Sequence, residues 1–178
     1  LCQEGLVFRS ACVAALNALS HPFTHPMALK ERGIPVAADE ELDFLQPTDV
    51  VVVVGYGRVI SALRRQGLSF HACDLRSAHS MRTLVVTEEL AWGPVGVTFH
   101  SEEDTGALLA AADVVLMTGS TLVNDTLPGL LAQCRQARVK GLFGPSAGLL
   151  PEYLLDLGLN YILYDRWQAP LSLARTLA

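Results

Sequence analysis

The stretch Val115-Leu-Met-Thr-Gly-Ser-Thr-Leu-Val-Asn-Asp-Thr126 decides the fold class of this chain. An apolar run typical of a buried strand ends at Met117, and a turn rich in hydroxyl groups follows it. The next segment, from Leu127 to about Ala137, has the pattern of a helix with Pro128 in its first turn. Ligands of open α/β sheets bind beyond the carboxyl ends of strands. The stretch therefore predicts a strand, loop and helix that carry a small-molecule site.

Five consecutive valines, Val50 to Val54, mark the strongest strand in the chain. Their lack of alternation indicates burial on both faces, which is typical of a central strand in a parallel sheet. Further strands are expected near residues 70, 114 and 140, with another near residue 161, and helical patterns lie between them. This alternation predicts an α/β fold, a Rossmann-like doubly wound and mostly parallel sheet with helices on both faces.

The first part of the chain does not follow this rhythm. A helix is predicted from Phe8 to Leu19, and the two prolines of Ser20-His-Pro-Phe-Thr-His-Pro26 then end it. We expect residues 1–47 to form a short N-terminal appendage, helical and then irregular, and residues 48–178 to form the Rossmann-like domain. The chain begins at Leu1 rather than Met, so we expect its first residues to be missing.

Charge and composition exclude some classes of partner. The net charge is −5 and the thirteen Lys and Arg residues are scattered, whereas nucleic-acid binding depends on clustered basic side chains. No apolar run approaches the roughly 20 residues of a membrane-spanning helix. Without a signal-peptide pattern, we expect a cytoplasmic protein with no nucleic-acid or membrane partner. The hydrophobic fraction of 51% leaves material for a homo-oligomer interface, such as that of a dimer.

The four cysteines (Cys2, Cys12, Cys73 and Cys134) are widely spaced and contain no Cys-x-x-Cys pair. This excludes the common zinc-finger spacings and favours reduced thiols.

Three predicted loops follow carboxyl ends of strands and should meet at one edge of the sheet. Their polar and glycine residues are Gly55, Tyr56 and Gly57, then Thr118, Gly119, Ser120, Thr121 and Asn124, then Gly144, Pro145 and Ser146. Hydroxyls and amides there favour an anion or a carbonyl-rich ligand. Alternatively, the same residues only cap helices and satisfy turns. We expect a small-molecule ligand at this edge. None of the three loops offers an evident catalytic nucleophile with a base beside it.

The first loop also imitates a dinucleotide-binding unit. Gly55-Tyr-Gly57 follows a strand, and Asp74 ends the next strand, where ribose-binding acids lie in nucleotide folds. The third glycine of the full fingerprint would fall at Ile60 and is absent. A tight strand-to-helix turn explains the two glycines equally well, and Asp74 equally suits a cap of the following turn.

One cluster of metal-ligand residue types occurs, from His71 to His79. His71 and Cys73 share one face of a predicted strand, so they could supply two ligands to zinc or a softer metal. The spacing matches no standard motif, and strand interiors also contain such residues without a metal. His21, His25 and His100 are isolated in the sequence.

Two stretches together resemble a known family. They are Asp113-Val-Val-Leu-Met-Thr-Gly-Ser-Thr-Leu-Val-Asn-Asp-Thr126 and Gly144-Pro-Ser-Ala-Gly-Leu-Leu-Pro-Glu152, and they are similar to a domain-of-unknown-function family described as putative heavy-metal chelation. Val50 to Gly55 and Ala15-Leu-Asn-Ala-Leu-Ser20 resemble it as well.

The resemblance implies a Rossmann-like carboxyl-terminal domain after a smaller α/β domain similar to an enolase amino-terminal fold, which is truncated here. A cleft between the parts would hold the ligand. In the family pattern a short acidic-to-proline link occupies this place, whereas here Asp74 is followed by a long insert through Trp92. The resemblance therefore transfers no nucleotide or metal role to this part of the chain.

Three functions are compatible with these features. The first is a small-molecule or metal-complex binding protein of the heavy-metal chelation type. The second is an enzyme that uses a nucleotide-like or pterin-like cofactor in the same cleft, with Asp74 contacting it. The third is a non-catalytic oligomeric module.

Overall fold

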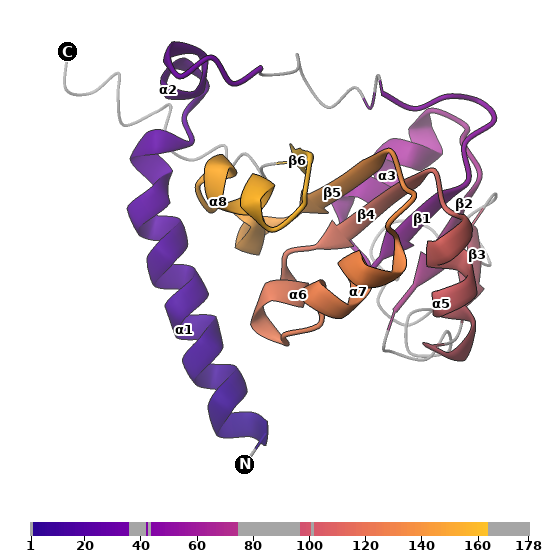
Figure 1. Ribbon diagram of the computed structural model, residues 1–178, viewed down its shortest axis with the longest axis horizontal. Coiled ribbons are helices and arrows are strands. Elements are labelled where there is room, and N and C mark those ends of the chain that lie inside the picture. Colours follow the sequence, from indigo (N-terminus) through magenta and orange to yellow (C-terminus); the bar gives the residue numbers. More distant parts are fainter. Residues whose placement is uncertain (1, 36–41, 43, 75–96, 101, 164–178) are drawn as a thin grey trace.

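The structure, a computed structural model, describes residues 2–35, 42, 44–74, 97–100 and 102–163 (Figure 1). One sheet contains the strands β1 (Val51–Val54), β2 (Phe70–Cys73), β3 (Val97–His100), β4 (Val114–Thr118), β5 (Val139–Phe143) and β6 (Tyr161–Leu163). Their order is β3-β2-β1-β4-β5-β6, and every neighbouring pair is parallel. This is the strand order of the Rossmann fold, so the predicted fold class is confirmed.

Helices cover both faces of the sheet. The helices in the described part of the chain are α1 (Cys2–Ser20), η1 (His21–Phe23), α2 (Pro26–Glu31), α3 (Arg58–Arg65), α5 (Glu102–Ala111), α6 (Ser120–Val123), α7 (Leu127–Gln133), η2 (Pro145–Ala147) and α8 (Pro151–Asp156). One core contains Leu63 of α3, and the other contains Leu109 of α5 and Leu154 of α8. The valines of β1 alternate between these two cores, with Val52 in one and Val53 in the other. Because helices cover both faces of the sheet, β1 has no side that faces solvent and is apolar on both faces.

Some predicted elements differ in their bounds or lie outside the described residues. The stretch after Met117 was expected to be a turn until Thr126, but residues 120–123 form the short helix α6. The strand marked by Val50 to Val54 begins one residue later, at Val51. The sequence pattern also predicts a strand at 83–87 and a terminal helix at 168–177, and both segments lie outside the described part of the chain.

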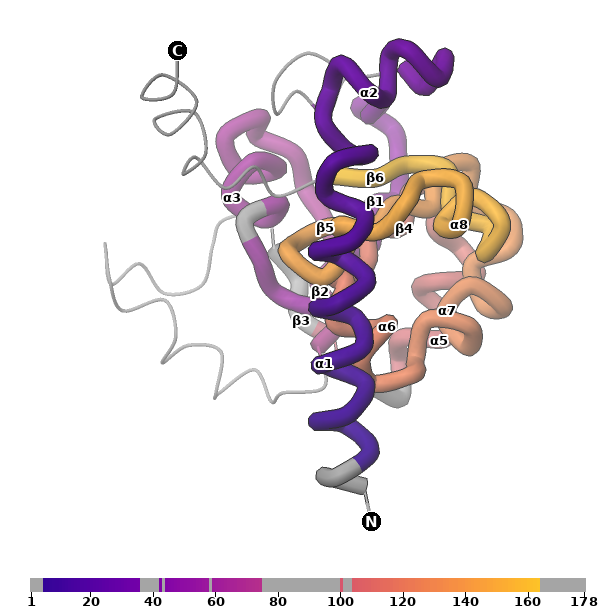
Figure 2. The backbone as a smooth tube through the Cα atoms, turned by 90° about the vertical axis from the view of Figure 1, so that its left-hand side faces the viewer, coloured from indigo at the N-terminus to yellow at the C-terminus, as the bar shows by residue number. Residues whose placement is uncertain are grey.

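The N-terminal segment is a long helix that lies against the carboxyl-end loops. Figures 1 and 2 show α1 running beside α6, and it also contacts η2. Several of its large apolar side chains are exposed, since Val7 is 70% exposed and Phe8 and Leu19 are each 71% exposed. The division between residues 47 and 48 stays a prediction. No helix in the described part of the chain is both long and apolar enough to cross a membrane.

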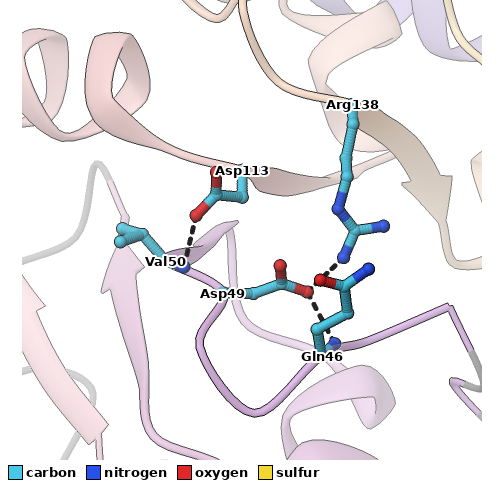
Figure 3. Close-up of polar contacts among 5 residues, drawn as sticks. All are labelled: Gln46, Asp49, Val50, Asp113 and Arg138. Carbon is cyan, nitrogen blue, oxygen red and sulfur yellow. Dashed lines mark hydrogen bonds and ion pairs between the residues drawn. The ribbon is translucent and has the colours of Figure 1, made fainter.

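The amino-terminal ends of three strands are joined by two aspartates (Figure 3). The carboxylate of Asp49 accepts a hydrogen bond from the backbone N–H of Gln46 at 2.7 Å and pairs with Arg138, just before β5. The carboxylate of Asp113 accepts a hydrogen bond from the backbone N–H of Val50 at 2.9 Å. Both aspartates therefore mark strand entries, at the end of the sheet opposite the candidate site.

Candidate functional site

The loops after β1 and β4 meet at the point where the strand order reverses. Gly55 has φ +91°, a conformation that favours glycine, and its N–H donates a hydrogen bond to the carbonyl of Cys73 at 2.7 Å. A Cβ at Gly55 would lie 2.5 Å from Cγ2 of Thr118. The turn after β1 therefore lies directly against the last residue of β4, and a larger residue at position 55 would separate them.

The loops after β4 and β5 are packed equally closely. The backbone N–H of Gly119 donates a hydrogen bond to the carbonyl of Phe143 at 2.7 Å. A Cβ at Gly119 would lie 2.6 Å from the backbone nitrogen of Ala147 and 2.7 Å from the carbonyl carbon of Ser146. Gly144 has φ +91° and lets the chain turn sharply after β5. All three predicted loops thus lie together at the carboxyl edge of the sheet.

Local structure accounts for some of the predicted polar residues. Thr121 is buried, and its hydroxyl donates a hydrogen bond to the carbonyl of Thr118 at 2.7 Å. The side-chain oxygen of Asn124 accepts hydrogen bonds from the hydroxyl of Thr126 at 2.7 Å and from its N–H at 3.3 Å. These two side chains fix the turn around α6, as the alternative interpretation of the loops proposed.

Thr118 and Ser120 are held more loosely. The Thr118 hydroxyl donates to the Ser120 hydroxyl at 3.4 Å and accepts from the Ser120 N–H at 3.5 Å, both near the upper limit for a hydrogen bond. Ser120 is exposed, while Thr118 and Ser146 are partly exposed. These hydroxyls can turn toward a ligand at little energetic cost.

The glycines of the first loop have a packing role. A Cβ at Gly57 would lie 2.8 Å from the ring of Phe143, so this ring fills the space beside the glycine. Ile60, where a third glycine would stand, is buried in the core beneath α3. Tyr56 is partly exposed beside these glycines, and Asp74 is partly exposed at the end of β2. Contacts within the protein therefore account for Gly55 and Gly57 without a dinucleotide.

Asn17 of α1 reaches the third loop, which the sequence did not single out. Its side-chain N–H donates a hydrogen bond to the carbonyl of Pro145 at 3.0 Å, and its Cγ would lie 3.4 Å from a Cβ at Gly148. Its oxygen Oδ1 is the one buried side-chain nitrogen or oxygen atom among the described residues without a hydrogen-bond partner. An asparagine between alanines and leucines in the second half of the helix was the available signal. Arg9, nearer the start of α1, forms an ion pair with Asp125 at 3.8 Å.

The two predicted metal ligands, His71 and Cys73, both lie on β2, which pairs with the edge strand β3. Nδ1 of His71 is 2.9 Å from Nε2 of His100, so His100 is not isolated in the fold. Burial, followed by the neighbouring His100, lowers the pKa of His71. Burial raises the pKa of the Cys73 thiol. A hydrogen bond with Thr105 has the opposite but smaller effect. A protonated thiol is a poor metal ligand.

In the ranges that the structure describes, no three His, Cys, Asp or Glu side chains gather in a way that could hold a metal ion. The pair His71 and His100 consists of two nitrogen donors, which suit a metal of the first transition row. The role of Cys73 as a metal ligand stays a prediction, and His79 lies outside the described residues.

The parallel sheet, its strand order and the loops at its carboxyl edge define a Rossmann-like α/β protein. Residues 40–178 match the model of the family described as "Putative heavy-metal chelation" (DUF364), and the chain belongs to this family. It is also 42% identical over 55 residues to an uncharacterized protein of Methanocaldococcus jannaschii, a match that covers 31% of this chain and 21% of that protein.

Two solved structures of the same family have a similar fold. A protein of unknown function from Pyrococcus horikoshii has a TM-score of 0.64 and 19% identity, over 96% of this chain and 63% of that one. A protein from Desulfitobacterium hafniense has a TM-score of 0.54 and 24% identity, over 79% of this chain and 49% of that one. This chain therefore spans less than two thirds of the length of either relative.

Proposed function

We propose that this chain binds a small molecule through oxygen-rich groups, alone or in complex with a metal ion, at the carboxyl edge of its sheet. The observation that carries the proposal is the meeting of three loops beside the switch point between β1 and β4. Gly55 lies against Thr118, and Gly119 lies against Ser146 and Ala147. This is where ligands bind in open α/β sheets.

The chemistry of the loops defines the ligand class. Residues 55–57, 118–124 and 144–146 include hydroxyl, amide and glycine residues but no Lys, Arg, Asp or Glu. Thr118 and Ser120 offer hydroxyl groups that make only long contacts with each other. Neutral hydrogen-bond donors suit carbonyl, carboxylate or phosphate oxygens, and hydroxyls also accept hydrogen bonds.

Asn17 adds an acceptor at the same place. An unpaired buried acceptor costs about 1–3 kcal/mol, and Oδ1 of Asn17 is such an atom. A hydroxyl or N–H of a ligand bound against η2 would remove this cost. The preferred ligand therefore carries at least one donor among its oxygen acceptors.

The family description is compatible with this site if the metal ion is bound as a complex with a small molecule. The three loops contain no His, Cys, Asp or Glu, the residues that usually bind heavy metals. A metal ion would therefore arrive already held by the small molecule, and the protein would recognise the outer oxygens of the complex. A nucleotide cofactor is less well supported, because the ring of Phe143 already accounts for the glycine at position 57.

Binding can be tested with defined probes. We expect citrate, or its Fe³⁺ or Ni²⁺ complex, to raise the melting temperature, and NADH, FMN and biopterin to leave it unchanged. In the variant Thr118→Val/Ser120→Ala, which keeps the shape of Thr118, the affinity should fall about tenfold or more. Ser61→Ala removes an exposed serine from α3 and is the matched control. Equal binding by both variants, or a response to the nucleotides alone, would refute the proposal.

A further inference from the structure

We propose that His71 and His100 form a second site, a two-imidazole chelate for a divalent cation with tetragonal geometry, such as Ni²⁺ or Cu²⁺. This site is independent of the proposed ligand site at the three loops. It binds the metal ion itself through the protein, whereas the loops would recognise the oxygens of a small molecule.

The strand register places the two imidazoles together. In the parallel pair β2 and β3, His71 is opposite Thr98 and Cys73 is opposite His100. Side chains alternate between the faces of a strand, so His71, Cys73 and His100 share one face. The two histidines are diagonal neighbours there, and both are partly exposed, so that a cation can reach them from solvent.

Distance favours one coordination geometry. Nδ1 of His71 and Nε2 of His100 are 2.9 Å apart. Two nitrogens at about 2.0–2.1 Å from a metal are separated by about 2.9 Å when they subtend 90°, and by about 3.3 Å at the tetrahedral angle. Cu²⁺ and Ni²⁺ prefer square or tetragonal arrangements, whereas zinc sites are usually tetrahedral. The two nitrogens are therefore already spaced for a chelate with an angle near 90°, as in a tetragonal copper or nickel site.

The orientation of the rings also leaves both nitrogens usable. The ring centroids are 4.9 Å apart and the planes are inclined by 55°, so the rings are tilted toward each other rather than stacked. Without metal, one imidazole nitrogen donates a hydrogen to the other. For both nitrogens to bind one metal ion, the two rings rotate until their lone pairs meet at one point beside the line that joins the nitrogens. Water molecules would complete the coordination of the ion.

A nickel titration of the untagged chain tests the site. We expect one Ni²⁺ per chain in competition with a chromophoric chelator, and an affinity at least tenfold lower in His71→Gln and in His100→Gln. Loss of an outer-shell partner alone typically lowers metal affinity 10–100-fold, and loss of a ligand should do no less. Bound Cu²⁺ should show nitrogen hyperfine splitting in its EPR spectrum, and this signal should change in both variants.

A matched control uses the other two described histidines. His21→Gln/His25→Gln also removes two imidazoles, both exposed, and should leave nickel affinity within about twofold. Circular dichroism of each variant verifies folding. An equal decrease in the control, or unchanged nickel affinity in both single variants, would overturn the site. Thr118→Val/Ser120→Ala should retain the nickel affinity, so failure of the loop site and failure of this site are distinguishable.

Discussion

The side-chain N–H of Asn17 in α1 donates a hydrogen bond to the carbonyl of Pro145 in η2 at 3.0 Å, although 128 positions separate the two residues. This bond joins the N-terminal helix to the loop after β5. The second polar atom of the same side chain, Oδ1, is buried beside it without a partner. Asn17 is therefore both a structural link and a candidate for ligand contact.

Substitutions at Asn17 should separate these two roles. Asn17→Ala removes one hydrogen bond and also the unpaired oxygen, so we expect the free energy of unfolding to fall by about 1 kcal/mol or less. Asn17→Asp removes the donor and keeps a buried oxygen that now carries charge, so it should be more destabilising. Urea denaturation of the two variants checks the order. A more stable Asp variant would contradict the assignment of the bond to Pro145.

Glycine substitutions should report on the packing of the loops. A Cβ at Gly119 would lie 2.6 Å from a backbone nitrogen that cannot move aside, so Gly119→Ala should lower stability by about 1–3 kcal/mol. A Cβ at Gly129 in α7 would have nothing within 4 Å, and Gly129→Ala should stabilise the helix by up to about 1 kcal/mol. Thermal unfolding of both variants measures the contrast, and similar effects would show that the loops are less closely packed.

The two aspartates at strand entries should differ in importance. The side chain of Asp49 is only 4% exposed and pairs with Arg138, whereas Asp113 is exposed. Asp49→Asn weakens a charge-assisted bond in a buried place, so it should lower the free energy of unfolding by about 1.5–3 kcal/mol. Asp113→Asn keeps an acceptor for the N–H of Val50, and its effect should stay below about 1 kcal/mol. Equal effects in denaturant titrations would contradict this difference.

Thiol reactivity should follow burial. Cys12 is exposed, whereas Cys73 and Cys134 are buried and burial raises the pKa of both thiols. A raised pKa means less thiolate at a given pH, and the thiolate is the reactive form. In a Cys2→Ser variant at pH 8, we expect one thiol to react quickly with iodoacetamide and two to react only after unfolding in urea. Mass spectrometry of the labelled peptides identifies the sites.

The local sequence pattern was sufficient for the fold and for the place of the three loops. The valines of β1 and the apolar run of β4 indicated buried parallel strands, because a strand covered on both faces has no polar side. The meeting of Gly55, Thr118 and Ser146 at one edge then followed from parallel topology. The helix α6 was missed because it contains only residues 120–123, too few for a periodic pattern.

Contacts between distant segments could not be predicted in the same way. His71 and His100 are 29 positions apart in the sequence, and only the pairing of β2 with β3 brings them together. The link from Asn17 to Pro145 depends on how α1 lies against η2, which no local pattern defines. Likewise, the roles of Thr121 and Asn124 in the turn depend on backbone geometry rather than on residue type.

The pairing of β1 with β4 has a consequence for the chain during its synthesis. Val51 is opposite Val114, so about sixty residues must be translated after β1 before its partner exists. At roughly 5–20 residues per second, this takes about 3–12 seconds. Throughout this interval, a run of valines has an open edge toward other chains, which is a template for aggregation. The yield of folded protein should therefore depend on the speed of translation and on chaperones that cover this strand.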